Sequence, residues 1–186
     1  MMMLVSSDSA EDVGLVRAAA AGDRTAFGEL YVRYARMVHA ILLGRVPPGE
    51  AEDMVQDVFV SAMRQLAGLR SAAAFPGWLA AIARNRATDY FRGSRERVPL
   101  DDKQASRQPA ARDAVEDAFL VLDVVRRLPE AYRETLILRL VEGLTGPEIA
   151  LRTGLTPESV RVNLCRGMKM LRELLGGRHL EGMEAR

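Results

Sequence analysis

Cationic side chains recur at helical spacing near the carboxyl end of the chain. Between residues 161 and 172, the positions that fall off the apolar side of a predicted helix are Arg161, Cys165, Arg166, Lys169 and Arg172. Guanidinium and ammonium groups donate hydrogen bonds to phosphates and to acceptor atoms on base edges. The chemistry that this surface predicts is the binding of DNA.

Two helices joined by a turn at residues 154–156 are predicted to present these cations. Thr145 with Glu148 forms a capping box that opens the first helix, and Gly154 can take the left-handed backbone that ends it. Thr156 then caps the second helix, with Pro157 at its first position. The apolar face of that helix consists of Val160, Leu164, Met168, Leu171 and Leu175. This pattern is typical of a helix-turn-helix that enters the major groove, and the alternative is an αα-hairpin inside an ordinary helical bundle.

A second set of polar residues shares one face of a helix predicted from Trp78 to about Arg92. Trp78, Asn85, Asp89 and Arg92 fall at helical steps, and Arg84 lies beside them. A ring, an amide, a carboxylate and a guanidinium suit unpaired bases, which offer a π-face and free hydrogen-bonding edges. The alternative interpretation is a solvated helix face with Trp78 half-buried in the core.

The overall charge hides local imbalances. The 186-residue chain carries a formal net charge of +1, and 48% of its residues are hydrophobic, enough for one or two folded domains. Five arginines against two acidic residues lie between positions 84 and 97, and five basic residues against one acidic residue lie between positions 161 and 178. Residues 50–57 form an acidic run. Because binding depends on where the bases cluster, the near-neutral total does not argue against nucleic acid.

Few residues are available for catalysis or metal binding. Cys165 is the only cysteine, and His39 and His179 are the only histidines. They assemble no catalytic triad and no zinc site, so we expect no enzyme activity, catalytic residue, metal, cofactor or small-molecule substrate. Cys165 is interpreted as an ordinary small residue, with a redox-active thiol as the alternative. No apolar run approaches about 18 residues and no basic signal-peptide start is present, so we expect a cytoplasmic protein without membrane insertion.

Composition and periodicity predict an all-α protein of two small helical domains. Alanine, leucine, arginine and methionine dominate, and alternating β-branched runs are missing. We expect four helices in residues 1–93, a flexible polar linker over residues 94–113, and four helices in residues 114–186. The expected helices are 9–21, from 23 or 25 to the prolines at 47 and 48, 51–66, 78–92, 114–127, 130–141 and the helix-turn-helix pair.

The two halves together resemble the ECF (extracytoplasmic function, group IV) bacterial RNA polymerase sigma factors. AED-x-x-Q-D-x-F followed by W-L-x-x-I-A-R-N and then L-P-E is far more specific than a lone helix-turn-helix. The resemblance covers about residues 14–175. The matching stretches are FGELYVRY (27–34), AEDMVQDVFV (51–60), WLAAIARNRATDYFR (78–92), RLPEAYRETLILR (127–139) and GLTGPEIALRTGLTPESVRVNLCRGMKMLREL (143–174).

This resemblance implies that residues 1–93 are sigma region 2 and residues 114–186 are sigma region 4. Region 2 would bind core RNA polymerase on its β′ coiled coil through Asp53, Gln56, Asp57 and Phe59. It would bind the melted minus-ten element through Trp78, Arg84, Asn85, Asp89 and Arg92, with one base flipped into the loop before Trp78. Region 4 would contact the β flap and bind the minus-thirty-five promoter DNA through Arg161, Val162, Cys165, Arg166 and Lys169. An anti-sigma factor is a further partner that this group leads us to expect.

The chain departs from the family pattern at some DNA-reading positions. Val162 and Asn163 stand where the family often carries serine and arginine, and Cys165 is not a typical base reader. The loop at residues 71–74 is poor in hydrogen-bonding side chains. Docking in the major groove is therefore predicted, but the DNA sequence that is read stays open.

Two other functions compete with this interpretation. A polymerase-independent, dimeric helix-turn-helix transcriptional regulator would bind palindromic sites, but the sequence shows no evident dimer seam or ligand pocket. A helical adaptor that does not bind DNA would leave the basic helix unexplained.

Overall fold

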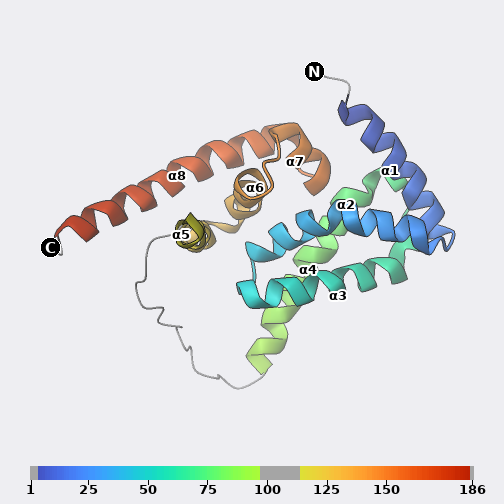
Figure 1. Cartoon of the computed structure of the whole chain (residues 1–186), viewed down its shortest axis with the longest axis horizontal. Helices are drawn as coiled ribbons and strands as arrows, with labels where there is room; N and C mark the ends of the chain where they lie inside the picture. The colour runs from blue at the N-terminus through green and yellow to red at the C-terminus, as the bar shows by residue number, and fades with distance from the viewer. Residues whose placement is uncertain (1–3, 97–113, 185–186) are drawn as a thin grey trace.

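The computed structural model describes the backbone of residues 4–96 and 114–184, and the side chains of residues 10–92 and 120–176. We call residues 4–96 the N-terminal half and residues 114–184 the C-terminal half. Within these ranges all regular structure is helical, with four α-helices in each half, as predicted. In chain order the elements are α1 (Leu4–Ala20), α2 (Arg24–Leu43), α3 (Pro48–Gln65), η1 (Leu66–Gly68), η2 (Ala72–Ala74), α4 (Phe75–Glu96), α5 (Ala114–Arg127), α6 (Glu130–Leu140), α7 (Gly146–Thr153) and α8 (Pro157–Glu184) (Figure 1).

The helix boundaries follow local capping chemistry. Asp23, one of the two predicted starts of this helix, is the cap of α2, because its Oδ1 accepts hydrogen bonds from the backbone N–H groups of Thr25 and Ala26. Helix α3 begins three residues earlier than predicted, at Pro48, since a proline in the first turn of a helix loses no hydrogen bond. Helix α4 also begins earlier, at the fully buried Phe75.

Two helices continue beyond the ends that the sequence predicts. Helix α4 continues to Glu96 and so enters the predicted linker, whose residues 97–113 lie outside the described part of the chain. Helix α8 continues to Glu184, so the carboxyl-terminal segment after Leu175, for which the sequence pattern offers no account, is an extension of this helix.

Helix α2 is the centre of the N-terminal half. Helices α1, α3 and α4 all pack against it, and in Figure 1 α4 crosses behind α2 and α3. Its residues Leu30, Met37 and Ile41 are fully buried.

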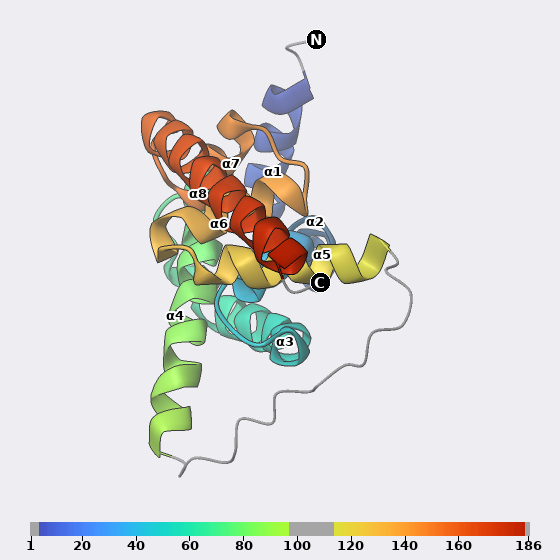
Figure 2. The same ribbon diagram turned by 90° about the vertical axis from the view of Figure 1, so that its left-hand side faces the viewer.

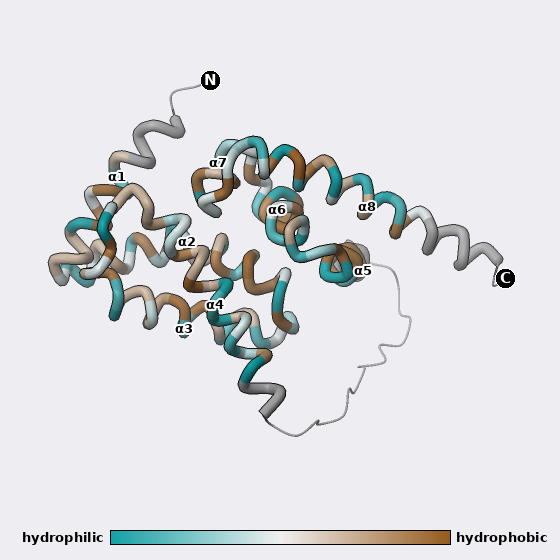
Figure 3. Tube along the Cα trace, turned by 180° about the vertical axis from the view of Figure 1, so that it is seen from behind, coloured by the Kyte–Doolittle hydropathy of each residue, from teal (hydrophilic) through white to brown (hydrophobic). Residues whose placement is uncertain are grey.

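Figure 3 shows hydrophobic and hydrophilic residues mixed along the described helices. None of these helices has the length and hydropathy that a membrane span needs, as far as the described residues go.

The predicted helix-turn-helix is confirmed in its capping details. Glu148 accepts hydrogen bonds from the backbone N–H of Thr145 at 2.7 Å and from its hydroxyl at 2.6 Å, within a capping box. Gly154 ends α7 with a φ of 74°, the left-handed conformation that glycine adopts without strain. The Thr156 hydroxyl accepts a hydrogen bond from the N–H of Ser159 and so caps α8. The caps and the turn therefore define where α7 ends and where α8 begins.

The two halves pack against each other. Helix α6 contacts α2, and α7 contacts α4. In both Figure 1 and Figure 2, α8 lies on the outer side of α6, away from α2. Buried apolar side chains from both halves form a single connected core.

Helix α8 packs tightly on α6 at Gly167. A Cβ atom at this position would lie 2.8 Å from Leu136 Cδ1 and 3.1 Å from Tyr132 Cβ. Gly167→Ala should therefore lower the free energy of unfolding by about 1–3 kcal/mol, because overpacking forces the two helices apart. Urea denaturation measures this change.

Gly176 in the same helix provides the matched control, since a Cβ there would meet nothing within 4 Å. Gly176→Ala should leave stability unchanged or raise it by up to about 1 kcal/mol, because alanine favours the helix. Equal stability of the two variants would show that Gly167 is not a close-packing position.

Candidate nucleic-acid interface

The cationic side of α8 faces solvent. Val160 and Leu171 are buried against the rest of the C-terminal half, as the predicted apolar face requires. The predicted DNA-binding positions Arg161, Arg166 and Lys169 are all exposed. The Lys169 ammonium lies 4.0 Å from Glu173, and both side chains are largely exposed, so this ion pair contributes little and leaves the ammonium available. Helix α8 therefore presents several free donors along one side.

Two further predicted positions on α8 are less polar. Val162 is partly buried, and Cys165 is an exposed free cysteine. Side chains of this kind offer apolar contact, such as to the methyl group of thymine, rather than hydrogen bonds to base edges.

Helix α4 carries an exposed polar stripe of Asn85, Asp89 and Arg92. An Arg92 nitrogen lies 3.5 Å from an Asp89 oxygen, one helical turn away, and both side chains are solvated. Trp78 stands apart from the stripe in burial, because it is partly buried and packs on Phe75 with ring centroids 5.8 Å apart. The structure thus supports the exposed stripe for three of the positions, and the half-buried interpretation for the tryptophan ring.

Arg84 does not join this stripe. Its Nε and Nη2 atoms donate hydrogen bonds to the two carboxylate oxygens of Glu134 on α6, at 2.9 and 2.7 Å. Nη2 also donates to the backbone oxygen of Thr153 at 2.9 Å. The hydrogen bonds to Glu134 raise the pKa of Arg84, against the effect of burial. Arg84 is therefore engaged by the C-terminal half and not free in this arrangement.

The partner residue Glu134 was not among the predicted site residues. The sequence signal nearest to it is Leu136, Ile137 and Leu138, three consecutive apolar residues that point to different sides of α6. A helix with apolar residues on several sides packs against more than one neighbour, and the structure indeed buries all of residues 134–138. Helix α6 lies between α8 and α2, so Glu134 meets arginines of the N-terminal half.

The loop before α4, which is predicted to receive a flipped base, forms one wall of a cavity. The cavity has a volume of about 330 Å³ and lies between this loop and α1. Arg17 of α1 and Arg70 of the loop both line it, next to Ser71. Sequence reasoning missed these arginines because α1 is distant in the chain and the loop itself is rich in alanine. They bring guanidinium donors to a loop whose residues 71–74 offer only the hydroxyl of Ser71.

Helix α3 carries the predicted polymerase-binding positions. Asp53, Gln56 and Asp57 are exposed, whereas Phe59 is only 3% exposed. The Phe59 ring packs against the ring of Tyr31, with centroids 4.7 Å apart. Phe59 therefore supports the surface from below instead of projecting from it.

An apolar groove runs beside these positions, between α2 and α3. It has a volume of about 330 Å³, and Gln56 and Phe59 are among the residues that line it. Its exposed apolar residues are Tyr31, Val60 and Met63, with exposed fractions of 38%, 44% and 55%. Contiguous exposed apolar residues are typical of interaction surfaces, and sequence periodicity did not single these three out.

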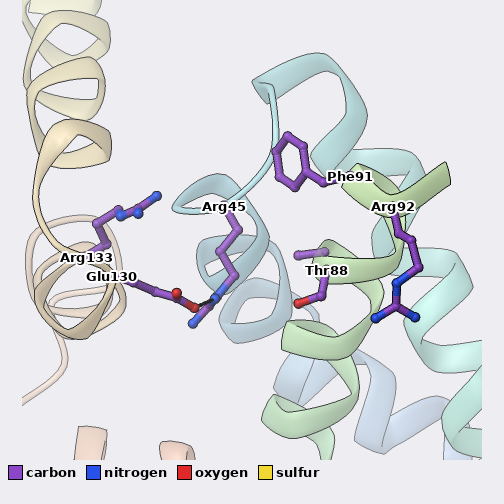
Figure 4. Close-up of a pocket in the computed structure, with 7 residues that line it drawn as sticks. Arg45, Thr88, Phe91, Arg92, Glu130 and Arg133 are labelled. Carbon is purple, nitrogen blue, oxygen red and sulfur yellow. Dashed lines mark hydrogen bonds and ion pairs between the residues drawn. The ribbon is translucent and has the colours of Figure 1, made fainter. Parts of the chain in front are cut away.

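Between the two halves lies a second, larger cavity of about 590 Å³. Arg45, Arg92 and Arg133 line it together with Glu130, and Figure 4 shows Arg45 turned toward Glu130. Among its charged lining residues, the cationic ones therefore outnumber the acidic one. Across the described residues no cluster of histidine, cysteine and carboxylate side chains could hold a metal ion.

Comparisons with known proteins match each half of the chain to a sigma-factor region. The family profile Sigma-70 region 2 matches residues 30–97, and the profile Sigma-70, region 4 matches residues 118–171. The chain is 34% identical over 179 residues to the ECF RNA polymerase sigma factor BldN of Streptomyces coelicolor, covering 91% of this chain and 67% of that protein. It is 35% identical to the RNA polymerase sigma factor CarQ of Myxococcus xanthus, covering 86% and 95% of the two chains.

Two further similarities point the same way. The ECF RNA polymerase sigma-E factor of Escherichia coli K12 is 30% identical over 180 residues, covering 89% of this chain and 94% of that protein. Among solved structures, CnrH in complex with the cytosolic domain of CnrY matches with a TM-score of 0.66 and 27% identity, covering 89% of this chain and 97% of that one. The alternative of a polymerase-independent regulator is not favoured, because both sigma regions match in the expected order. The chain belongs to the ECF family of RNA polymerase sigma factors.

Proposed function

We propose that this sigma factor holds promoter DNA at two places while it is docked on core polymerase in the cytoplasm. Helix α4 binds the melted minus-ten element, and helix α8 binds the minus-thirty-five element as a duplex. The observation that carries this proposal is the pair of exposed polar faces in the two sigma regions, made of Asn85, Asp89 and Arg92 on α4 and of Arg161, Arg166 and Lys169 on α8. The sigma factor performs no bond chemistry of its own.

At the minus-ten element, the cavity beside the loop receives a flipped base. Its volume of about 330 Å³ lies at the lower end of the range of small-ligand sites, roughly 300–1,000 Å³. Flipping costs a few kcal/mol, which hydrogen bonds to the base edge and stacking must offset. Arg17 and Arg70 provide donors for an acceptor-rich edge, and the exposed Asn85 contacts a neighbouring base.

On the polymerase, the surface of α3 docks on the β′ coiled coil. The exposed carboxylates of Asp53 and Asp57 suit a basic partner and speed the encounter. Tyr31, Val60 and Met63 in the adjacent groove supply the apolar contacts that usually provide most of the affinity at interfaces. The C-terminal half contacts the β flap.

A protein inhibitor is a further partner in this proposal. The similar protein CnrH has been solved in complex with the cytosolic domain of CnrY. We extend this kind of association to the present chain, as an anti-sigma factor that binds it when polymerase is absent.

Run-off transcription with purified core polymerase and a promoter library tests the proposed function. The chain should direct initiation at a defined subset of promoters, and core polymerase alone should not. Absence of specific initiation would overturn the proposal.

Arg161→Ala should weaken binding of the minus-thirty-five duplex by about 1–3 kcal/mol and relax sequence preference at one position, if Arg161 contacts a base edge. Lys169→Ala is the comparison, because a phosphate contact weakens binding to all sequences and reduces the salt slope by about 1. Affinity of the holoenzyme for a duplex library at several salt concentrations measures both effects. An unchanged sequence profile for Arg161→Ala would demote Arg161 to a phosphate contact.

Asn85→Ala should impair promoter opening by about 1 kcal/mol, roughly fivefold, because an exposed amide that bonds an unpaired base is lost. Permanganate reactivity of unpaired thymines measures opening. Binding to the minus-thirty-five duplex should stay intact and is the internal control. Normal opening by this variant would remove Asn85 from the minus-ten contact.

Met63→Asp should weaken binding to core polymerase by about 1–3 kcal/mol, because it places a charge in the apolar groove. Met63→Leu is the matched control and should retain affinity, since it keeps an apolar side chain of similar volume. Competition against another sigma factor for core polymerase measures the difference. Equal affinity of both variants would move the interface away from this groove.

A further inference from the structure

Glu134 is a buried carboxylate that the C-terminal half contributes to the interface between the halves. Only 7% of the residue is exposed. Arg84 donates two hydrogen bonds to it, and Arg45 donates a third from Nη2 at 3.2 Å. Both arginines belong to the N-terminal half, so this carboxylate is satisfied by ion pairs only while the halves are in contact.

Further contacts hold the halves together around this ion pair. Arg126 donates hydrogen bonds to the backbone oxygens of Leu43 and Val46 at the carboxyl end of α2, at 2.8 and 2.6 Å. The last carbonyls of a helix lack partners within the helix, and a cation there also suits the helix dipole. Ile137 packs at Gly44, where a Cβ atom would come within 2.8 Å of its Cδ1. The contact is therefore specific in charge and in shape.

The interface also contains groups that are better satisfied when it opens. The Nε atoms of Arg45 and Arg133 are buried without a hydrogen-bond partner. Buried donors without partners weaken an association, because they regain hydrogen bonds to water on exposure. We call this arrangement, with the two halves in contact, closed. A few strong contacts stabilise it and the unpaired buried donors oppose it, as a reversible contact requires.

In the closed arrangement the two DNA-binding elements are too close to engage a promoter together. A Cβ atom on Gly77, at the start of α4, would lie 3.3 Å from Gly154 Cα in the turn of the helix-turn-helix. The minus-ten and minus-thirty-five positions are about 25 base pairs apart, or about 85 Å along a duplex at 3.4 Å per base pair. Simultaneous binding at both elements therefore requires the halves to separate.

Separation breaks the ion pair between Arg84 and Glu134. A guanidinium binds a carboxylate and a phosphate with the same forked pair of hydrogen bonds, so Glu134 occupies the donors that a DNA phosphate would use. We propose that Glu134 is an autoinhibitory phosphate mimic, which holds the free sigma factor closed and keeps Arg84 from single-stranded promoter DNA until polymerase docking separates the halves. This inference rests on the proposed function of α4 at the minus-ten element.

Glu134→Gln in the full-length chain tests this proposal, because the carboxamide keeps the shape of the side chain and removes its charge. Without polymerase, the variant should bind a fluorescein-labelled single-stranded DNA of mixed sequence about tenfold more tightly than the wild type, since a larger fraction of molecules is open. Its radius of gyration from X-ray scattering should increase. Combining Glu134→Gln with Arg84→Ala should abolish the gain in affinity, which assigns the gain to Arg84.

Glu142→Gln is the matched control. Glu142 lies in the same half and also pairs across the interface, but with Arg36, whose side chain is 77% exposed and lies outside the polar stripe of α4. This variant removes the same charge and should bind the single strand within about twofold of the wild type. An equal gain for Glu142→Gln and Glu134→Gln would show a general charge effect and overturn the proposal.

Gly44→Leu provides a second route to opening that changes no charge. The backbone of Gly44 has a φ of −73°, which any residue adopts, and the new side chain would clash with Ile137 across the interface. It should reproduce the gain in single-strand binding. Wild-type affinity in both Glu134→Gln and Gly44→Leu, or a larger radius without any gain in affinity, would overturn the autoinhibitory role.

Run-off transcription at saturating core polymerase distinguishes a failure of the autoinhibitory contact from a failure of the proposed sigma function. If the wild type initiates specifically but Glu134→Gln gains no single-strand affinity, the autoinhibitory contact is wrong and the sigma function stands. If the wild type does not initiate, the sigma function itself fails.

Discussion

The arrangement of the two halves depends on one buried carboxylate, that of Glu134. A charge removed from water is costly unless ion pairs and hydrogen bonds replace its hydration. The C-terminal half provides the acid, and the N-terminal half provides both arginines that satisfy it. Such a pair adds little net stability compared with an apolar contact, but it is expensive to leave half-formed. The ion pairs therefore form and break together. Either Glu134 is paired with Arg45 and Arg84, or all three side chains are solvated.

The carboxyl end of α2 imposes a second constraint on the same interface. Its terminal carbonyls need donors, and Arg126 and Arg133 of the C-terminal half supply them. Gly44 leaves room there for Ile137, so the two helices meet closely at this point. Because these bonds go to backbone atoms, they hold α5 through Arg126 and α6 through Arg133 at the end of α2 without requiring particular side chains in the N-terminal half. The Glu134 ion pairs, in contrast, require the arginine side chains of Arg45 and Arg84 in the N-terminal half.

The sequence predicts local structure well and contacts between distant segments poorly, and the reason is physical. Thr145, Gly154 and Thr156 act on their own backbone neighbourhood, so capping chemistry located the helix-turn-helix correctly. The apolar face of α8 follows from helical period alone. The partner of Arg84 lies fifty positions away, and no period within one helix shows which residue of another helix will face it. The same limit hid Arg17 beside the loop before α4, and it gave no sign that Phe59, an expected contact position, lies beneath a groove between α2 and α3.

The closed arrangement leaves the proposed duplex-binding cations of α8 exposed but blocks Arg84 at the proposed single-strand site. This difference affects how the protein would bind a promoter. Arg161, Arg166 and Lys169 remain exposed while Arg84 is held by Glu134. Long-range attraction to duplex DNA depends on exposed cations and needs no opening. In the proposed function, capture of a single strand by Arg84 needs the ion pair with Glu134 to break first. Within the proposed function, duplex encounter and strand capture are therefore separate steps, and docking on polymerase decides when the second step becomes available.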